Sequence, residues 1–153
     1  MEVFNVFGDE WNDEAVERPG GTFKDAWIGH RLGAELLGGS LYEVPPHGRA
    51  WPYHYHHGNE ELLIVVAGTP TVRTPDGERV FEPGDCVLFP RGPDGAHTFW
   101  NDSDDPARVM MMSTLFMPEV VNYPDSGKLG AGSQFGRGRF LESSNVDYWE
   151  GEQ

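Results

Sequence analysis

The sequence has little cysteine and no long apolar run, and both shortages exclude classes of protein. Cys86 is the single cysteine, so no disulfide can form within the chain, and we expect a reducing, cytoplasmic compartment. The longest apolar run, residues 62–67, is far too short to cross a bilayer. The opening residues, MEVFNVFGDEW, lack the basic and apolar regions of a signal peptide, so we expect no secretory leader.

Basic residues are also scarce. The chain has 11 lysines and arginines against 25 aspartates and glutamates, which gives a formal net charge of −14. Such a field repels phosphate backbones and anionic lipid surfaces. We therefore exclude nucleic acid and membranes as partners, and expect a small-molecule ligand instead.

What the chain does have is a series of short apolar segments separated by turns. Residues 36–117 contain segments rich in β-branched and aromatic residues, divided by Gly- and Pro-containing turns such as PDG and EPGD. This pattern predicts an all-β sandwich or barrel in a chain of single-domain length. We expect residues 1–35 to form an N-terminal arm that packs on the barrel or on a partner subunit. Residues 118–153 are expected to form a C-terminal loop and strand-like extension, in which the Gly-rich residues 126–139 are interpreted as a surface loop.

One stretch, PYHYHHGNEELL, concentrates imidazoles and carboxylates beside an apolar run. Side chains alternate between the two faces of a strand, so His54 and His56 point the same way, about 6–7 Å apart. If the chain turns back after His56, Glu61 shares a face with Leu63 and Val65 in a hairpin partner. Two imidazoles and a carboxylate on one inward face form much of the coordination shell of a divalent cation.

A fourth ligand candidate follows the turn PRGPDG. His97 begins another strand-like segment, and by parity it shares a face with Phe99 and Asn101. A barrel that places this strand beside the first would close a site of three histidines and one glutamate.

The spacing of these residues resembles the two motifs of the cupin superfamily, in particular the small single-domain "cupin 2" type. The first motif matches at every spacing, with Gly48, His54, His56, Glu61 and Gly68. The second matches at Gly84, Pro90, Gly92, His97 and Asn101, except that four residues rather than two separate Gly92 from His97. The resemblance covers roughly residues 40–117.

The resemblance implies a double-stranded β-helix, or jelly roll, with one metal ion inside the barrel. Its implied ligands are His54, His56, Glu61 and His97, and the ion is Zn, Fe, Mn or Ni. We expect a pocket beside the metal, with an apolar wall that includes Leu63, Val65 and Phe99 and with the turn before His97 at its rim.

Three classes of function fit this picture. We favour a mononuclear metal enzyme with oxygenase, isomerase or lyase chemistry on a small molecule that is neutral or weakly charged and partly apolar. The second class is a noncatalytic metal-dependent binder or sensor. The third is an activity like that of a sugar-phosphate isomerase, which the net charge and the few arginines close to the motifs disfavour. No general base is evident beyond the ligands, and we expect the chain to form a homodimer.

Overall fold

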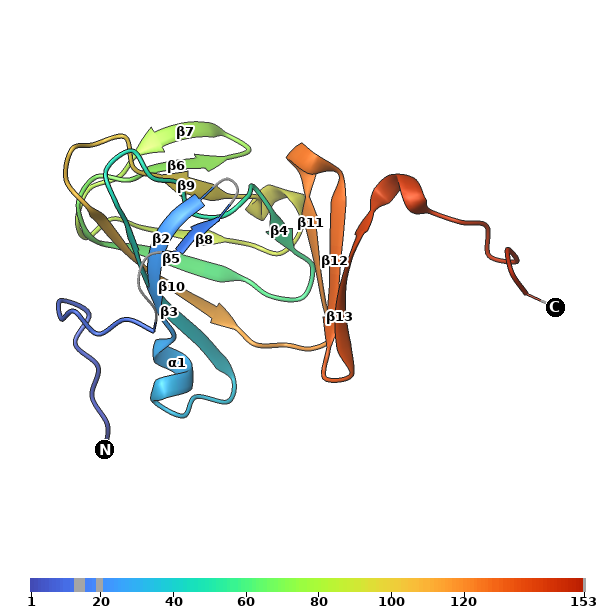
Figure 1. Ribbon diagram of the computed structural model, residues 1–153, viewed down its shortest axis with the longest axis horizontal. Coiled ribbons are helices and arrows are strands. Elements are labelled where there is room, and N and C mark those ends of the chain that lie inside the picture. Colours follow the sequence, from blue (N-terminus) through green and yellow to red (C-terminus); the bar gives the residue numbers. More distant parts are fainter. Residues whose placement is uncertain (13–15, 19–20, 153) are drawn as a thin grey trace.

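The structure is a computed structural model that describes residues 1–12, 16–18 and 21–152, and its regular elements are almost all antiparallel strands. Three sheets surround one interior, and the last strands stand as a separate wall against the main body (Figure 1). The only α-helix among the described residues is the single turn α1 (Ile28–Arg31). Short 3-10 turns span Pro93–Gly95, Pro124–Ser126 and Glu142–Ser144. None of the described helices has the length and hydropathy that a membrane span requires.

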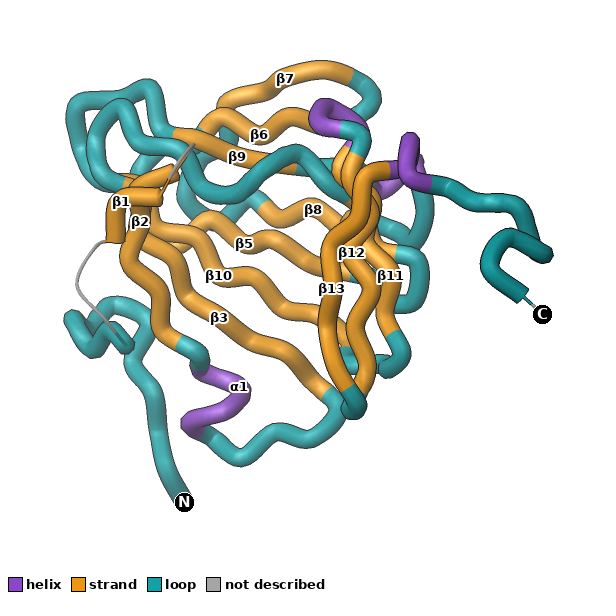
Figure 2. Tube along the Cα trace, turned by 45° about the vertical axis from the view of Figure 1, so that its right-hand side comes forward, coloured by secondary structure: helices purple, strands orange, loops and turns teal. Residues whose placement is uncertain are grey.

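The largest sheet has six strands. Their order across the sheet is β1 (Val16–Arg18), β2 (Gly21–Ala26), β3 (Leu37–Val44), β10 (Ala107–Thr114), β5 (Glu61–Ala67) and β8 (Cys86–Phe89). Figure 2 shows this sheet face on, with the C-terminal strands crossing at one end.

Two smaller sheets complete the enclosure. A four-stranded sheet runs in the order β13 (Gly136–Leu141), β12 (Lys128–Ser133), β11 (Glu119–Tyr123) and β4 (Tyr55–His56). A three-stranded sheet has the order β7 (Gly77–Val80), β6 (Thr71–Thr74) and β9 (Thr98–Trp100).

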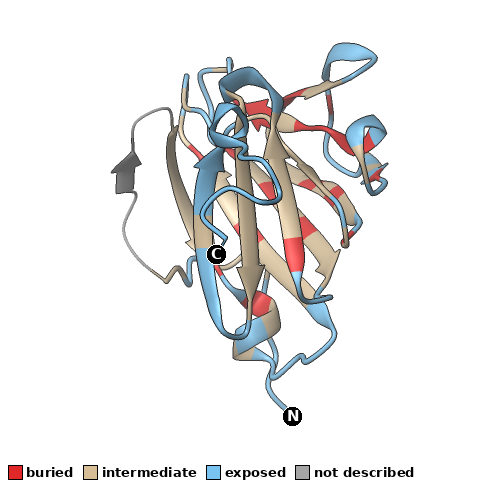
Figure 3. Ribbon diagram, turned by 90° about the vertical axis from the view of Figure 1, so that its right-hand side faces the viewer, coloured by how far each residue is buried: buried red, intermediate tan, exposed pale blue. Residues whose placement is uncertain are grey.

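The core lies between these sheets and follows strand alternation. Leu63 and Val65 point inward from β5 and pack with Phe99 of β9 and Val109 of β10, and all four are buried. The buried segments cluster in the middle of the sheets, whereas the C-terminal tail is exposed (Figure 3). On β8, Val87 packs against the core and Phe89 is buried, so these two residues point inward. Cys86 alternates with them and is therefore exposed on the outer face.

The N-terminal segment covers part of the outer face of the six-stranded sheet. Phe4, Val6 and Trp11 pack on a second apolar cluster that includes Leu41 of β3. Arg108 anchors this segment, because its guanidinium donates hydrogen bonds to the carbonyl oxygens of residues 6 and 8 and pairs with a carboxylate of β3.

The interpretation of residues 126–139 as a surface loop is wrong. Residues 128–133 and 136–141 form the hairpin of β12 and β13, and β12 pairs along its length with β11. Glycine has low strand propensity, so the local sequence does not predict the hairpin. Backbone pairing with β11 stabilises these strands instead.

Candidate metal centre

The structure brings His54, His56 and Glu61 together at one end of the barrel. One ligand atom from each residue lies within 4.8 Å of the others, so the cluster could hold a metal ion. The expected hairpin between the histidine segment and β5 is wrong. β4 pairs with β11 in the four-stranded sheet, whereas β5 lies in the six-stranded sheet, so Glu61 meets the histidines across the interior.

His97 joins this cluster through the backbone. His54 and His97 form an isolated antiparallel bridge, with reciprocal N–H···O bonds of 3.1 and 2.9 Å. Their ring centroids are 4.7 Å apart, and His97 Nε2 lies 3.1 Å from Glu61 Oε2. His97 is almost fully buried and stacks on the ring of Phe89 at 3.8 Å.

Two backbone carbonyls fix the orientation of these imidazoles. His54 Nδ1 lies 2.9 Å from the Pro52 oxygen, and His97 Nδ1 lies 2.9 Å from the Gly95 oxygen. A carbonyl oxygen only accepts hydrogen bonds, so each Nδ1 carries a proton and the Nε2 of each ring is left to face the cluster. This is the tautomer that a metal-binding histidine needs.

The buried Nε2 of His97 shows how well the residues fit a cation. This nitrogen has no hydrogen-bond partner within the described chain, although it faces the Glu61 carboxylate. A nitrogen and a carboxylate oxygen at 3.1 Å attract each other only when a proton or a metal ion lies between them. A divalent ion bound by imidazole nitrogens and one carboxylate meets this condition, and the donor set suits Zn, Fe, Mn or Ni.

The pKa values of the cluster favour the ligand protonation state at His54 and Glu61, but not at His56. Burial, together with the neighbouring His97, lowers the pKa of His54 to about 3, so this ring is neutral at pH 7. Burial opposes ionisation of Glu61, but its contacts with the His56 and His97 rings outweigh burial and hold its pKa well below the usual range. Burial also lowers the pKa of His56, yet contacts with Glu61 and Glu119 outweigh it, and the net shift is upward.

Glu119 is the residue of this centre that the sequence did not reveal. It lies on β11, and its Oε1 is 3.6 Å from His56 Nδ1, while His56 Nε2 is 3.3 Å from Glu61 Oε2. The same oxygen accepts hydrogen bonds from the backbone N–H groups of His57 and Gly58, and the other carboxylate oxygen accepts from the Asn59 amide. His56 therefore lies between two carboxylates, one on the side of the cluster and one behind it. A glutamate in the predicted extension carried no motif signal, because only the pairing of β11 with β4 brings it to His56.

A cleft of about 420 Å³ opens from the cluster and is rimmed by aromatic side chains. Tyr42 packs edge-on against Trp51 at 4.7 Å, and Tyr123 stacks over His54 at 5.9 Å. Burial raises the pKa of Tyr42, more than its hydrogen bond with Ser40 lowers it, so its hydroxyl keeps its proton at neutral pH. The cleft therefore offers an apolar wall, a hydroxyl donor and the open side of the cluster.

The expected wall residues lie deeper than this cleft. Leu63, Val65 and Phe99 are nearly fully buried in the core, and none of them lines the cleft. Phe99 reaches it only through Trp51, whose ring packs edge-on against the phenyl ring at 4.8 Å. Their role in substrate binding stays a prediction.

The turn before His97 orients this ring through the Gly95 carbonyl, and none of the turn residues lines the cleft at whose rim it was expected. Gly92 has a φ of 87°, a left-handed conformation that glycine adopts without strain, and its N–H donates to the His56 oxygen at 2.7 Å. Gly95 is packed so closely that a Cβ there would lie 1.7 Å from the Pro90 oxygen. Gly92 and Gly95 thus fix the backbone around the carbonyl that orients His97.

Comparison with known proteins assigns the class. The family model described as a cupin domain, Cupin_2, matches residues 40–113, which span β3 to β10. Residues 40–113 therefore form a cupin domain of the cupin 2 type, and the predicted double-stranded β-helix is confirmed. The division into an N-terminal arm and a C-terminal extension stays a prediction. No curated protein matches the chain.

Solved structures with the same fold carry different names. A sugar phosphate isomerase from Silicibacter pomeroyi is 24% identical with a TM-score of 0.78, and the alignment covers 90% of this chain and 91% of that one. The polyketide cyclase RemF from Streptomyces resistomycificus is 24% identical with a TM-score of 0.61, over 74% and 79% of the two chains. A predicted oxalate decarboxylase from Thermotoga maritima is 15% identical with a TM-score of 0.54, over 63% and 83%. At these identities the likeness shows the fold alone.

Proposed function

We propose that this chain is a mononuclear metal enzyme that acts on a small organic molecule. Its ligands in this proposal are His54, His56, Glu61 and His97, and the ion is Zn, Fe, Mn or Ni. The observation that carries the proposal is that the cluster faces an aromatic cleft, rather than being closed by protein on all sides. A structural metal site is usually closed, whereas a catalytic site keeps a position open for substrate.

The side chains around the cleft have distinct parts in this proposal. When bound, the ion acts as a Lewis acid toward a substrate oxygen. Trp51 and Tyr123 hold the substrate between apolar surfaces and keep water from the cluster. The Tyr42 hydroxyl, protonated at neutral pH, donates a hydrogen bond or a proton to the substrate. This assigns Tyr42 a role that the sequence did not suggest.

The experiment is a turnover assay on protein loaded separately with Fe, Mn, Ni and Zn. Small keto acids, diketones and phenolic compounds are supplied, and oxygen uptake and products are followed by an electrode and mass spectrometry. We expect turnover with at least one metal and its loss in Glu61→Gln. Tyr42→Phe should keep the metal and lose most of the turnover. Compounds that bind at the cleft without turnover under any metal would support the noncatalytic binder or sensor instead.

We also infer that the chain works as a cytoplasmic homodimer. The described protomer exposes about 9,900 Å² of surface, whereas a compact monomer of 17.1 kDa exposes roughly 7,800 Å². The C-terminal tail extends away from the body (Figure 1) and exposes Tyr148 and Trp149. Aromatic surface of this kind favours burial against a second copy.

A further inference from the structure

The inner face of the four-stranded sheet carries two arginines toward the metal cluster. Arg137 pairs with Gly132, and Gly132 pairs in turn with Glu119. In the next row, Arg139 pairs with Gly130, which pairs with Val121, and Val121 pairs with His56 of β4. Directly paired residues of antiparallel strands share a face. Both arginines therefore lie on the face of the sheet that carries His56.

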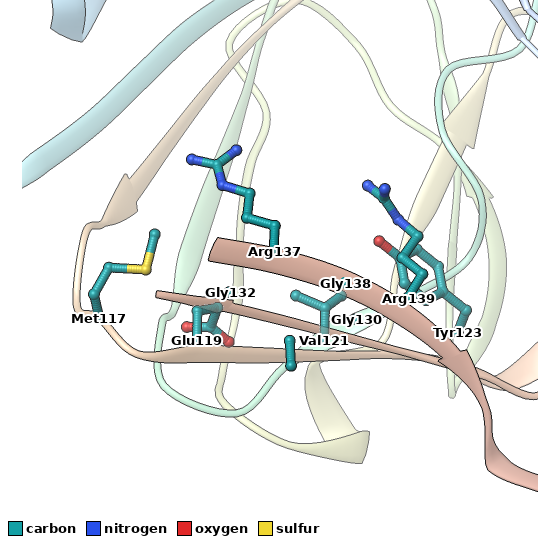
Figure 4. Close-up of a pocket in the computed structure, with 10 residues that line it drawn as sticks. Met117, Glu119, Val121, Tyr123, Gly130, Gly132, Arg137, Gly138 and Arg139 are labelled. Carbon is teal, nitrogen blue, oxygen red and sulfur yellow. The ribbon is translucent and has the colours of Figure 1, made fainter. Parts of the chain in front are cut away.

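The glycines of β12 leave a hollow beneath these arginines. Gly130 and Gly132 place no side chain between β13 and β11, and a cavity of about 210 Å³ lies over them. Figure 4 shows the two guanidinium groups projecting to the same side of β13, with the Tyr123 ring beside Arg139. A Cβ added at Gly132 would lie 3.6 Å from the Arg137 side chain, which is an ordinary contact. The backbone conformation therefore does not require glycine here, and the effect of the glycine is to leave the hollow open.

Although the chain is strongly acidic, the two guanidinium groups have no acidic partner among the described residues. Arg73 pairs with Asp125 at 2.6 Å, and Arg108 pairs with Glu43 at 2.6 Å. Across residues 1–12, 16–18 and 21–152, no ion pair or hydrogen bond engages the side chain of Arg137 or Arg139. Glu119 lines the same hollow, but its oxygens accept from two backbone N–H groups and the Asn59 amide.

The hollow and the metal cleft are neighbours. Tyr123 and Arg139 line both cavities. A molecule that reaches the cluster past Tyr123 therefore places its far end beside the arginines. Guanidinium groups bind carboxylate and phosphate oxygens through paired, charge-assisted hydrogen bonds.

We propose that Arg137 and Arg139 form an anion subsite that binds a carboxylate or phosphate group of the molecule whose other end reaches the His54–His56–Glu61 cluster. The substrate is then an organic anion, rather than the neutral or weakly charged molecule expected from the sequence. The small number of arginines near the motifs disfavoured a phosphorylated substrate. The hairpin of β12 and β13 supplies two arginines from later in the chain. This inference rests on the proposed function, because it names the substrate class of the same site.

The subsite is tested on the metal-free, full-length protein. Inorganic phosphate and acetate are titrated separately at constant ionic strength, with chloride as the control anion. The arginine side-chain NMR signals of ¹⁵N-labelled protein report binding. We expect saturable shifts with phosphate, acetate or both, and the responding anion identifies the group that is bound. Arg137→Gln with Arg139→Gln should weaken binding by about tenfold or more, since two charge-assisted hydrogen bonds are lost.

Two further variants make the result specific. Arg49→Gln with Arg79→Gln removes the same charge from two exposed arginines that contact aromatic rings elsewhere, and should leave binding unchanged. Gly132→Val keeps both arginines and fills the hollow, so it should also weaken binding. Absence of saturable binding in the wild type, or equal loss in both arginine pairs, would overturn the subsite.

Metal uptake is measured in parallel on every variant. Normal metal uptake without anion binding would refute the subsite and leave the metal centre standing. Arginine-dependent anion binding without any metal uptake would refute the proposed enzyme and leave the anion subsite standing.

Discussion

Glu119 Oε1 lies 3.6 Å from His56 Nδ1, on the opposite side of the imidazole from Glu61, whose Oε2 lies 3.3 Å from Nε2. Nδ1 has no hydrogen-bond partner among the described residues, so this contact acts through charge: the carboxylate behind the ring favours the proton on Nδ1, which leaves Nε2 to face the cluster. Such outer carboxylates commonly change metal affinity by about 10- to 100-fold.

Glu119→Gln should accordingly weaken metal binding by about tenfold, because the amide is a poorer partner for the imidazole N–H. The measurement is competitive metal titration against a chelating dye. Glu60→Gln is the matched control, since its carboxylate is adjacent to Glu61 in sequence but exposed. Equal affinities for the two variants would refute the positioning role of Glu119.

The depressed pKa of His54 predicts how acid affects the metal-free protein. Its folded pKa of about 3 lies below the usual value of 6.5, so between these pH values the unfolded chain binds a proton that the folded chain does not. Stability then falls as pH drops below about 6.5. The wild type should lose about 1–2 kcal/mol relative to His54→Asn between pH 7.5 and 5.

Urea unfolding at several pH values in the presence of a chelator measures this difference. His30→Asn is the matched control, because it removes an imidazole that is exposed rather than part of the cluster. A difference between wild type and His54→Asn that stays constant with pH would contradict the assignment of His54 as a buried neutral imidazole.

Phe99→Ala tests whether Phe99 is a core residue or a pocket residue. Phe99 is fully buried and packs with the central apolar cluster, so the truncation should cost about 3–5 kcal/mol of unfolding free energy. Thermal and urea unfolding measure this cost, with Phe135→Ala as the exposed control, which should change stability little. A Phe99→Ala protein as stable as the wild type, but weaker in ligand binding, would instead support the role expected from the sequence.

The homodimer predicts a species of twice 17.1 kDa in light scattering at micromolar concentration. Tyr148→Ser with Trp149→Ser removes two exposed aromatic side chains from the tail and should shift the protein toward the monomer. Phe7→Ser is the control, since it removes an exposed ring from the other end of the chain. A wild-type monomer at these concentrations would exclude the dimer.

The sequence predicted the barrel and its cluster because their signals are local. Strand alternation puts Glu61 on the inward face with Leu63, and motif spacing brings His97 into the same set. Residues that reach the site through the pairing of distant strands could not be predicted from the local sequence. Glu119 and Arg139 reach the site only because β11 pairs with β4 and the Gly-rich β12 carries β13 beside it. Glycine-rich strands have weak local preference, so their partners in the sheet determine where they lie.

The metal content of the purified protein tests the central proposal most directly. Wild-type protein is refolded at neutral pH with excess Mn, Fe, Ni and Zn salts, freed of unbound metal, and measured by elemental mass spectrometry beside His56→Ala. We expect about one ion per chain in the wild type and a large loss in the variant, because neutral His56 supplies one of four ligands in the proposed centre. A wild-type metal content near zero would contradict it.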